Sequence, residues 1–299
     1  MTAVQLPSFE PGSPEWDEQR RRAVGGSEIA AILGIGKWES RFSLWHRKAG
    51  TLGPQGDNDQ MEWGRRLEPV ILAKYADDHP DAVIGRAGTF AHPERSWQLA
   101  NVDAFVGEPD GPDGIVECKT QRDDFDHLWG EPGTDEIPVY YRAQCLWYMD
   151  VLDAPWCDIA VLIAGSDYRE YRVQYDIDEA RMMRGAAVEF LQSLEANERP
   201  DIDAHQATYQ AVRELHPDIE PQSIDLPADL ARNYCNARHE LKRAEETALL
   251  QRSLVADAMG TAQYAKFLGQ TIARRQTKGA SLPFVVAGDN PLTFEEVPA

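Results

Sequence analysis

The period of the hydrophobic pattern changes near residue 83, and this change limits the chain to a fold that combines helices with strands. Before it, Trp63, Leu67, Ile71 and Tyr75 recur every four residues, which is the spacing of one helix face. After it, apolar and polar residues alternate in short runs separated by turn-forming clusters. These runs predict an antiparallel meander of three strands: VIGRAGTF, LANVDAFVG and GIVECKT.

Helices are predicted on both sides of these strands. We expect Ser27 to be the N-cap of a short apolar helix that Gly34 ends. After the strands, a helix begins near Pro138, two strands joined through Gly165–Asp167 follow, and a further helix covers residues 178–197. This order predicts an α+β fold with a central mixed β-sheet flanked by helices.

Composition divides the chain into five segments. Residues 1–15 are rich in Pro, Ser and Gly, and residues 201–225, which we interpret as a linker, are rich in Pro, Asp and Glu. Beyond the linker, apolar residues step by three or four along a long helix, whose seam predicts packing on the main domain or on another subunit. The predicted segments are a flexible N-terminal arm (1–15), the main domain (16–200), the linker (201–225), the long helix plus β-hairpin (226–278) and a C-terminal tail (279–299).

The bulk composition excludes several classes of protein. A net charge of −20 argues against a protein that coats nucleic acid non-specifically, although a local basic channel is compatible with it. No apolar run reaches the roughly 18 residues of a membrane span, and the N-terminus lacks the layout of a signal peptide, so we expect no membrane and a cytoplasmic location. The four cysteines show no metal-ligand spacing.

The strand GIVECKT carries the residues with chemical potential. Alternation places Ile115, Glu117 and Lys119 on one face of that strand. Thirteen residues lie between Asp103 and Glu117, enough for a hairpin that brings both carboxylates together. Such a pair repels unless a divalent cation lies between, and Mg²⁺ favours carboxylate oxygens and can activate water. Lys119 could orient that water or stabilise the developing negative charge.

The residues alone leave a structural alternative open. The pattern D-x₁₃-E-x-K is short, and an aspartate in a turn beside an exposed Glu117–Lys119 pair on an edge strand satisfies it equally well. The same holds for the aromatic residues, because Trp16, Trp38 and Trp45 can stack on bases but are more commonly buried.

Five segments occur in an order that separates these alternatives. They are W-x₃-R before GGSEIAAILG, then WGRRLEP, ANVDAFVG, GIVECKT, and VYYRAQCLWYM ahead of AVLIAG. In this order they resemble the YqaJ viral recombinase family, relatives of phage lambda exonuclease within the PD-(D/E)xK nuclease superfamily. The resemblance spans roughly residues 14–195. It implies a restriction-endonuclease-like core, to which this chain adds its C-terminal helix and hairpin.

The resemblance assigns roles by position. It implies that Asp103 and Glu117 are metal-binding catalytic carboxylates and that the backbone carbonyl of Cys118 is a further ligand. Lys119 matches the catalytic lysine of the motif. Glu68 resembles the helix-borne acid of the family, which acts near the metal and can be an additional ligand.

Three further residues are assigned in the same way. Gln144 resembles the glutamine that completes the motif and orients the nucleophile. Arg20 and Ser27 resemble residues that hold a DNA phosphate, and a helix N-terminus attracts anions. Each also has a structural alternative. Gln144 could be an amide at the edge of the core, Arg20 a solvated surface charge, and Ser27 an ordinary helix N-cap. Where many relatives have serine and proline before the first aspartate, this chain has Asn101 and Val102.

The implied function is 5′-to-3′ digestion of double-stranded DNA ends by a Mg²⁺-dependent exonuclease, with Mn²⁺ as a substitute. The resemblance also implies phage-type recombination with a single-strand annealing protein, a homotrimer, and a bacterial host cell with a phage or prophage gene. Two alternatives remain: a structure-specific or nicking endonuclease with the same metal centre, and a non-catalytic DNA-binding recombination scaffold. In the C-terminal segment, Arg274, Arg275 and Lys278 are interpreted as solvated charges in preference to a DNA contact.

Overall fold

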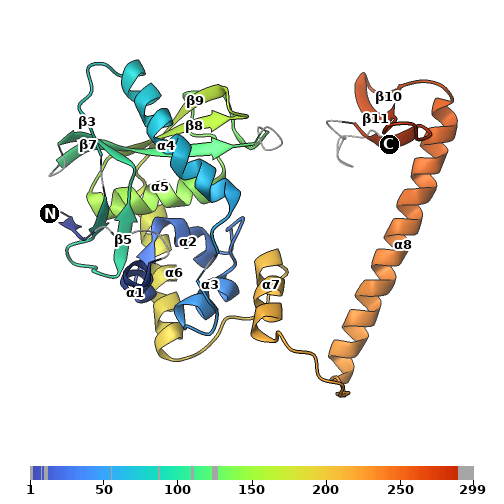
Figure 1. Ribbon diagram of the computed structural model, residues 1–299, viewed down its shortest axis with the longest axis horizontal. Helices are drawn as coiled ribbons and strands as arrows, with labels where there is room; N and C mark the ends of the chain where they lie inside the picture. Colours follow the sequence, from blue (N-terminus) through green and yellow to red (C-terminus); the bar gives the residue numbers. More distant parts are fainter. Residues whose placement is uncertain are drawn as a thin grey trace. The chain divides into compact units, whose positions relative to one another are not determined.

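The computed structural model describes residues 3–7, 9, 13–54, 56–86, 88–108, 111–122 and 127–288 (Figure 1). The chain divides into two compact units, Met1–Asp218 and Ile219–Ala299. Helices of the first unit are α1 (Pro14–Arg21), α2 (Gly26–Ile32), α3 (Arg41–Lys48), α4 (Asp59–Asp78), α5 (Val139–Leu152), α6 (Ile177–Glu195) and α7 (Gln206–Leu215).

A five-stranded mixed sheet forms the centre of the first unit, in the order β3-β6-β7-β8-β9. β7 pairs antiparallel with β6 and parallel with β8, and both outer pairs are antiparallel. This sheet, flanked by helices, confirms the predicted α+β, restriction-endonuclease-like core. Its strands are β3 (Ile84–Arg86), β6 (Ala104–Glu108), β7 (Gly111–Gln121), β8 (Trp156–Ile163) and β9 (Asp167–Gln174).

Helices cover both faces of this sheet (Figure 1). Ile115 of β7 belongs to the main core, together with buried residues of α5 and α6, whereas the adjacent Val116 packs with Ile71 and Tyr75 of α4. The alternation predicted for this strand is therefore confirmed, because consecutive side chains enter different cores. The face of α4 predicted from the four-residue spacing is buried at Ile71 and Tyr75, while Trp63 is exposed.

A second sheet has the order β1-β4-β5-β2, with strands Val4–Gln5, Thr89–Ala91, Gln98–Asn101 and Val24–Gly25 in that order. It corrects one prediction. The run LANVDAFVG is not one strand, since the chain leaves β5 at Asn101 and enters β6 of the central sheet at Ala104. In the segment predicted to be a flexible N-terminal arm, Val4–Gln5 pairs with β4.

The predicted linker 201–225 is also wrong in its first half, where α7 packs on α3. Buried Ala211 of α7 clusters with Phe42 and Leu52, so this short amphipathic helix continues the core past residue 200. Sequence periodicity over ten residues between polar stretches was too short to distinguish a helix from a loop.

The second unit contains one long helix and a small antiparallel sheet of order β10-β11-β12. The helix and the β10–β11 hairpin lie in the segment 226–278 in which they were predicted. β12 lies in the predicted C-terminal tail. Residues 289–299 of that tail are outside the described part of the chain. Within the described residues, no helix is both long and apolar enough to cross a membrane. The elements are α8 (Ala228–Met259), β10 (Tyr264–Phe267), β11 (Gln270–Gln276) and β12 (Phe284–Ala287).

Candidate active site

A pocket of about 1420 Å³ in the first unit collects every site residue predicted from the sequence. β7 supplies part of its lining, the bend between β5 and β6 supplies Asp103, and α1, α2, α4 and α5 supply the other predicted residues. The predicted residues that line it are Arg20, Ser27, Glu68, Asp103, Glu117, Cys118, Lys119 and Gln144.

Glu117 is buried in the middle of this group, on the face of β7 that meets α5. Its Oε1 accepts a hydrogen bond of 2.6 Å from Lys119 Nζ and one of 2.7 Å from Gln144 Nε2. Its Oε2 is buried and has no hydrogen-bond partner among the described residues. A buried carboxylate oxygen without a partner is unfavourable, so this atom is available to a ligand.

Asp103 lies at the bend where the chain passes from the second sheet into β6. Its Oδ2 accepts a hydrogen bond of 2.7 Å from the backbone N–H of Cys118. The antiparallel ladder between β6 and β7 ends at Ala104 and Val116, so the aspartate side chain takes the place of the next ladder partner. This contact fixes Asp103 beside the residue that follows Glu117, as the predicted hairpin required.

Burial changes the electrostatics of both carboxyl groups. It raises the pKa of Glu117 to about 8, and the negative charge of Asp103 adds to this increase while Lys119 opposes it. Burial likewise raises the pKa of Asp103. Two such groups next to each other favour either protonation or a bound cation.

Lys119 remains charged because its partners outweigh its burial. Burial alone would lower the pKa of Lys119, but Glu117 and then the nearby Tyr141 and Asp103 raise it above the ordinary value. Lys119 Nζ also donates to Gln144 Oε1 over 3.2 Å. Gln144 thus donates through its amide nitrogen to Glu117 and accepts through its oxygen from Lys119, which fixes both side chains.

Tyr148 supports Gln144 from the next turn of α5, and the sequence interpretation missed it. Gln144 Nε2 lies 3.0 Å from the Tyr148 hydroxyl. Tyr148 packs directly on Gly26, where an added Cβ would lie 2.3 Å from the tyrosine ring. Spacing of four residues on one helix could have indicated Tyr148 as a neighbour of Gln144.

Glu68 reaches the pocket from α4 and is half-buried. Its negative charge raises the pKa of Glu117. The pKa of the Cys118 thiol is raised mainly by burial, then by Asp103 and Glu117, and also by Glu68. The helix-borne acid implied by the resemblance is therefore close enough to act on the same site electrostatically.

Arg20 and Ser27 meet at another part of the pocket. Arg20 Nη2 donates to Ser27 Oγ over 3.1 Å. The prediction that Ser27 is the helix N-cap is wrong, since Gly25 holds that position and Ser27 lies within the first turn of α2. The Ser27 hydroxyl accepts a hydrogen bond from Arg20 and is not the cap of the helix.

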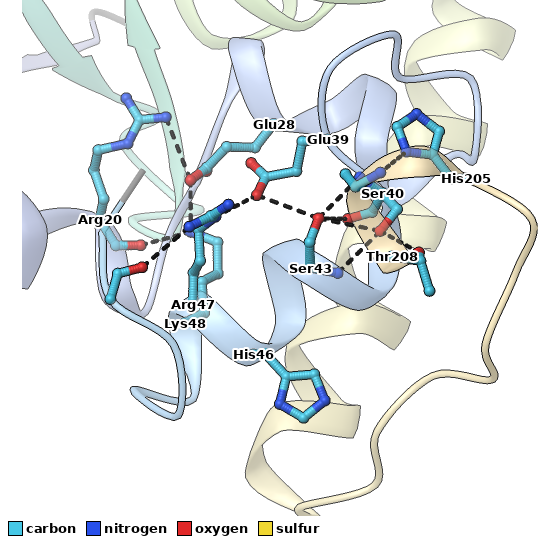
Figure 2. A network of polar contacts seen from close by, with 12 residues as sticks. Arg20, Glu28, Glu39, Ser40, Ser43, His46, Arg47, Lys48, His205 and Thr208 are labelled. Atoms are coloured by element: carbon cyan, nitrogen blue, oxygen red, sulfur yellow. Dashed lines mark hydrogen bonds and ion pairs between the residues drawn. The ribbon is translucent and has the colours of Figure 1, made fainter. Parts of the chain in front are cut away.

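A buried ion pair holds this region together, and sequence reasoning did not identify it. Glu28 accepts from the Gly25 N–H at 2.8 Å and lies 2.9 Å from Lys48 Nζ and 3.4 Å from Arg20 Nη2. Figure 2 shows the Lys48 side chain between Glu28 and Arg20. Lys48 Nζ donates to the backbone oxygens of Arg20 and Ala23 over 2.8 and 2.7 Å. The glutamate three residues after a helix N-cap was the available signal.

The donor set suits a hard divalent cation. Within the described part of the chain, no three His, Cys, Asp or Glu side chains are arranged to hold a metal. Two carboxylates are present, however, and the unpartnered Glu117 Oε2 is one of their oxygens. Mg²⁺ commonly takes one or two carboxylates and completes its shell with water and phosphate oxygens, so the residues present fit it.

Comparison with known proteins gives the following similarities. Residues 15–155 match the family described as YqaJ-like viral recombinase domain. The uncharacterized protein YqaJ of Bacillus subtilis (strain 168) is 26% identical over 263 residues, which covers 85% of this chain and 80% of that protein.

Two solved structures overlap the chain more loosely. An alkaline exonuclease from Laribacter hongkongensis shares 21% identity with a TM-score of 0.49, covering 62% of this chain and 94% of its own. A phage related exonuclease from Haemophilus somnus 129PT shares 15% identity with a TM-score of 0.44, covering 58% and 96%. The family match over residues 15–155 and the B. subtilis relative support the resemblance to the YqaJ-like viral recombinase family that the sequence analysis stated.

Proposed function

We propose that this protein is a metal-dependent deoxyribonuclease that hydrolyses phosphodiester bonds from the ends of double-stranded DNA. The observation that carries the proposal is Glu117: a buried carboxylate on a central strand, with one oxygen unpartnered and the other held by Lys119 and Gln144. Asp103 lies beside it. A purely structural role would not require a buried and a half-buried carboxyl group side by side in the lining of a large pocket.

In this proposal, one group of residues binds the metal ion. Asp103 and Glu117 would hold Mg²⁺, with Mn²⁺ as a substitute. The backbone carbonyl of Cys118 would be a further ligand, because it points to the same strand edge as the Cys118 N–H that donates to Asp103. The bound cation supplies charge neutralisation at the phosphate and activation of water. Glu68 adds negative charge that favours the cation.

Lys119 and Gln144 act on the reacting groups. Lys119 is cationic and fixed by two hydrogen bonds, so it stabilises the negative charge that develops on phosphate oxygens. Gln144 holds Lys119 and Glu117 in one arrangement and helps orient the nucleophile. Arg20 and Ser27 bind a phosphate of the DNA, since a guanidinium and a hydroxyl both donate to phosphate oxygens.

The family supplies the biological context of the proposal. A viral recombinase domain favours a role in recombination, in which digestion from 5′ ends leaves a strand for a single-strand annealing protein. We extend the proposal to a homotrimer and to the cytoplasm of a bacterial host.

A digestion time course tests the proposal. The purified protein is incubated with end-labelled linear duplex and with a covalently closed circle, each with and without Mg²⁺. Loss of linear duplex only with Mg²⁺, and survival of the circle, is the expected result. Nicking of the circle identifies an endonuclease, and an intact linear duplex with Mg²⁺ contradicts the proposal. A 5′ label released before a 3′ label gives the polarity.

A further inference from the structure

The long helix α8 exposes most of its surface. It has 32 residues and is therefore about 48 Å long. Residues 228–254 are exposed, apart from the half-buried Ala231, and more buried positions follow where the end of the helix packs on β10 and β12 (Figure 1). Most of the stability of a helix in a protein comes from packing of its apolar face. A partner should therefore cover the exposed length of α8.

The apolar residues of α8 are spaced in heptads. Eight residues follow one another at alternate steps of four and three, and all but the glutamine are apolar or aromatic. The average step of 3.5 residues keeps such a stripe aligned along a second long helix, whereas a step of 3.6 suits the surface of a globular core. We call this set the α8 seam: Leu230, Tyr234, Ala237, Leu241, Ala244, Ala248, Gln251 and Val255.

The large side chains of the seam are open to water. Leu230, Tyr234 and Leu241 are 55%, 64% and 52% exposed. A contiguous apolar stripe of this kind on a water-exposed helix marks a site of protein association. Its heptad spacing identifies the complementary surface as another helix of similar length, and α8 of a second copy is such a helix.

Charged residues beside the seam distinguish the two directions in which a second α8 could lie. Arg238 and Glu245 are seven residues apart and lie on the same flank of the seam, and Glu240 lies on the other flank. In an antiparallel pair, like flanks face each other, so Arg238 of one helix meets Glu245 of the second. In a parallel pair, opposite flanks face each other, so Glu240 meets Glu245. Opposite charges thus favour the antiparallel pair.

Arg238 and Glu245 are available for this contact. Within the described part of the chain neither residue takes part in an ion pair, whereas Lys242 and Glu246, which are turned away from the seam, lie 3.9 Å apart. The same flank therefore carries a cation and an anion whose complements lie on a second copy.

The register set by this contact also aligns the seam. It places Leu241 of each helix on Ala244 of the other, and Ala237 of each on Ala248 of the other. Where a large side chain faces a small one, two helices can approach closely and their side chains interdigitate. Charge and size complementarity therefore select the same alignment.

We propose that α8 pairs antiparallel with α8 of a second copy of this chain, along the seam and in this register. A two-fold axis relates the two copies, so every contact occurs twice. The inference does not depend on the proposed nuclease function, because the seam residues do not line the active-site pocket. If the first unit forms the homotrimer proposed above, three such helix pairs join two trimers.

Sedimentation equilibrium of the full chain over a range of concentrations measures the mass of the assembly. Leu241→Glu places two like charges in the middle of the paired helices, so the mass should fall to half that of the unaltered protein. Glutamate is a good helix former, so the substitution does not itself break α8. Leu249 is 62% exposed on α8 but lies outside the seam, and Leu249→Glu should leave the mass unchanged.

Charge reversal tests the direction and the register. Glu245→Arg makes arginine face arginine at two places, so it should raise the dissociation constant of the helix pair by about tenfold or more. The double variant Arg238→Glu with Glu245→Arg exchanges the two charges and should restore the affinity of the unaltered protein. Glu246→Arg, the same change on the side of α8 away from the seam, should leave the dissociation constant unchanged.

Three results would overturn the proposal. An unchanged mass in Leu241→Glu would mean that the first unit or another protein covers the seam. Stronger association of Glu245→Arg would indicate parallel helices, because the substitution would then remove the repulsion between Glu240 and Glu245. A double variant that associates as weakly as Glu245→Arg would show that Arg238 and Glu245 do not face each other.

Discussion

Gln144 Nε2 on α5 donates to Glu117 Oε1 on β7 over 2.7 Å, and the other end of the same amide accepts from Lys119. One side chain from a helix therefore orients two groups from a neighbouring strand. A carboxylate that is held by an oriented donor keeps its remaining oxygen in a fixed position, here Glu117 Oε2, which has no partner in the described part of the chain.

We predict that Gln144→Ala lowers the rate of Mg²⁺-dependent duplex digestion by about 10- to 100-fold, the usual effect of removing a residue that orients a metal-binding side chain. The concentration of Mg²⁺ needed for half-maximal rate should rise, since Glu117 loses an orienting donor. Steady-state digestion across a Mg²⁺ series measures both quantities. Gln210→Ala, an exposed glutamine on α7, serves as the control. An unchanged rate in Gln144→Ala would show that Lys119 alone orders the site.

Metal binding itself can be measured without DNA. The buried Glu117 and the neighbouring, half-buried Asp103 should be stabilised by a divalent cation, so Mg²⁺ should raise the melting temperature of the protein. We expect this increase to be lost in Glu117→Gln and in Asp103→Asn, and both variants should fail to digest linear duplex. Calorimetric melting with Mg²⁺ and with EDTA gives the result. A variant that keeps both the increase and the activity would remove its residue from the metal site.

The sequence predicted which residues lie together in the pocket better than it predicted the surrounding structure. Strand alternation was sufficient to place Glu117 and Lys119 on one face, and the pocket contains every assigned residue. Contacts that join distant elements were not predictable. The Glu28–Lys48 pair connects α2 with α3, and short-range periodicity carries no information about which helices meet.

The same limit explains the errors in the fold. Only Val102 and Asp103 lie between β5 and β6, and neither is Gly or Pro, so no strong local signal marks the passage from one sheet to the other. α7 escaped prediction because its burial depends on Phe42, far away in the sequence. Ser27 has the chemistry of an N-cap, but Arg20 binds its hydroxyl.

Glu28 should make a large contribution to stability at neutral pH. Burial raises the pKa of Glu28, but Arg20 and Lys48 outweigh it and hold the pKa below its ordinary value of 4.5. A carboxyl group with a lowered folded-state pKa contributes stability above the unfolded value, and this contribution is lost as pH falls through the folded value. Glu28→Gln leaves Lys48 buried without its closest carboxylate, which typically costs about 3 to 5 kcal/mol.

Urea denaturation of the unaltered protein and of Glu28→Gln near neutral pH and in acid measures this contribution. The difference in the free energy of unfolding should be large near neutral pH and should shrink in acid. The double variant Glu28→Gln with Lys48→Met should recover part of the loss, because it removes the unpaired charge. A difference that does not depend on pH would indicate lost packing instead of lost charge.

The contact between α7 and the loop before α3 makes a further prediction. The Thr208 hydroxyl lies 2.6 Å from Ser40 Oγ and 2.5 Å from Asp203 Oδ1, and Thr208 is 1% exposed. Thr208→Val keeps the shape but leaves buried partners unsatisfied, at a cost of about 1 to 3 kcal/mol. The free energy of unfolding measures it, with Thr247→Val on the exposed surface of α8 as control. Equal stability of the Thr208 variant would show that water replaces the hydroxyl.

Arg20 gives the sharpest test of the phosphate contact, because lysine can supply its charge but not its planar fork. Arg20 already donates to Ser27 and lies beside Glu28, so its guanidinium is oriented before DNA binds. If it holds a 5′-terminal phosphate, the unaltered enzyme should digest 5′-phosphorylated duplex faster than 5′-hydroxyl duplex, and Arg20→Lys should remove most of that preference. Ser27→Ala should weaken it by a smaller factor. Digestion rates of the two duplexes, compared within each variant, cancel any general loss of activity. A preference that survives in Arg20→Lys would assign the terminal phosphate to another cation of the pocket.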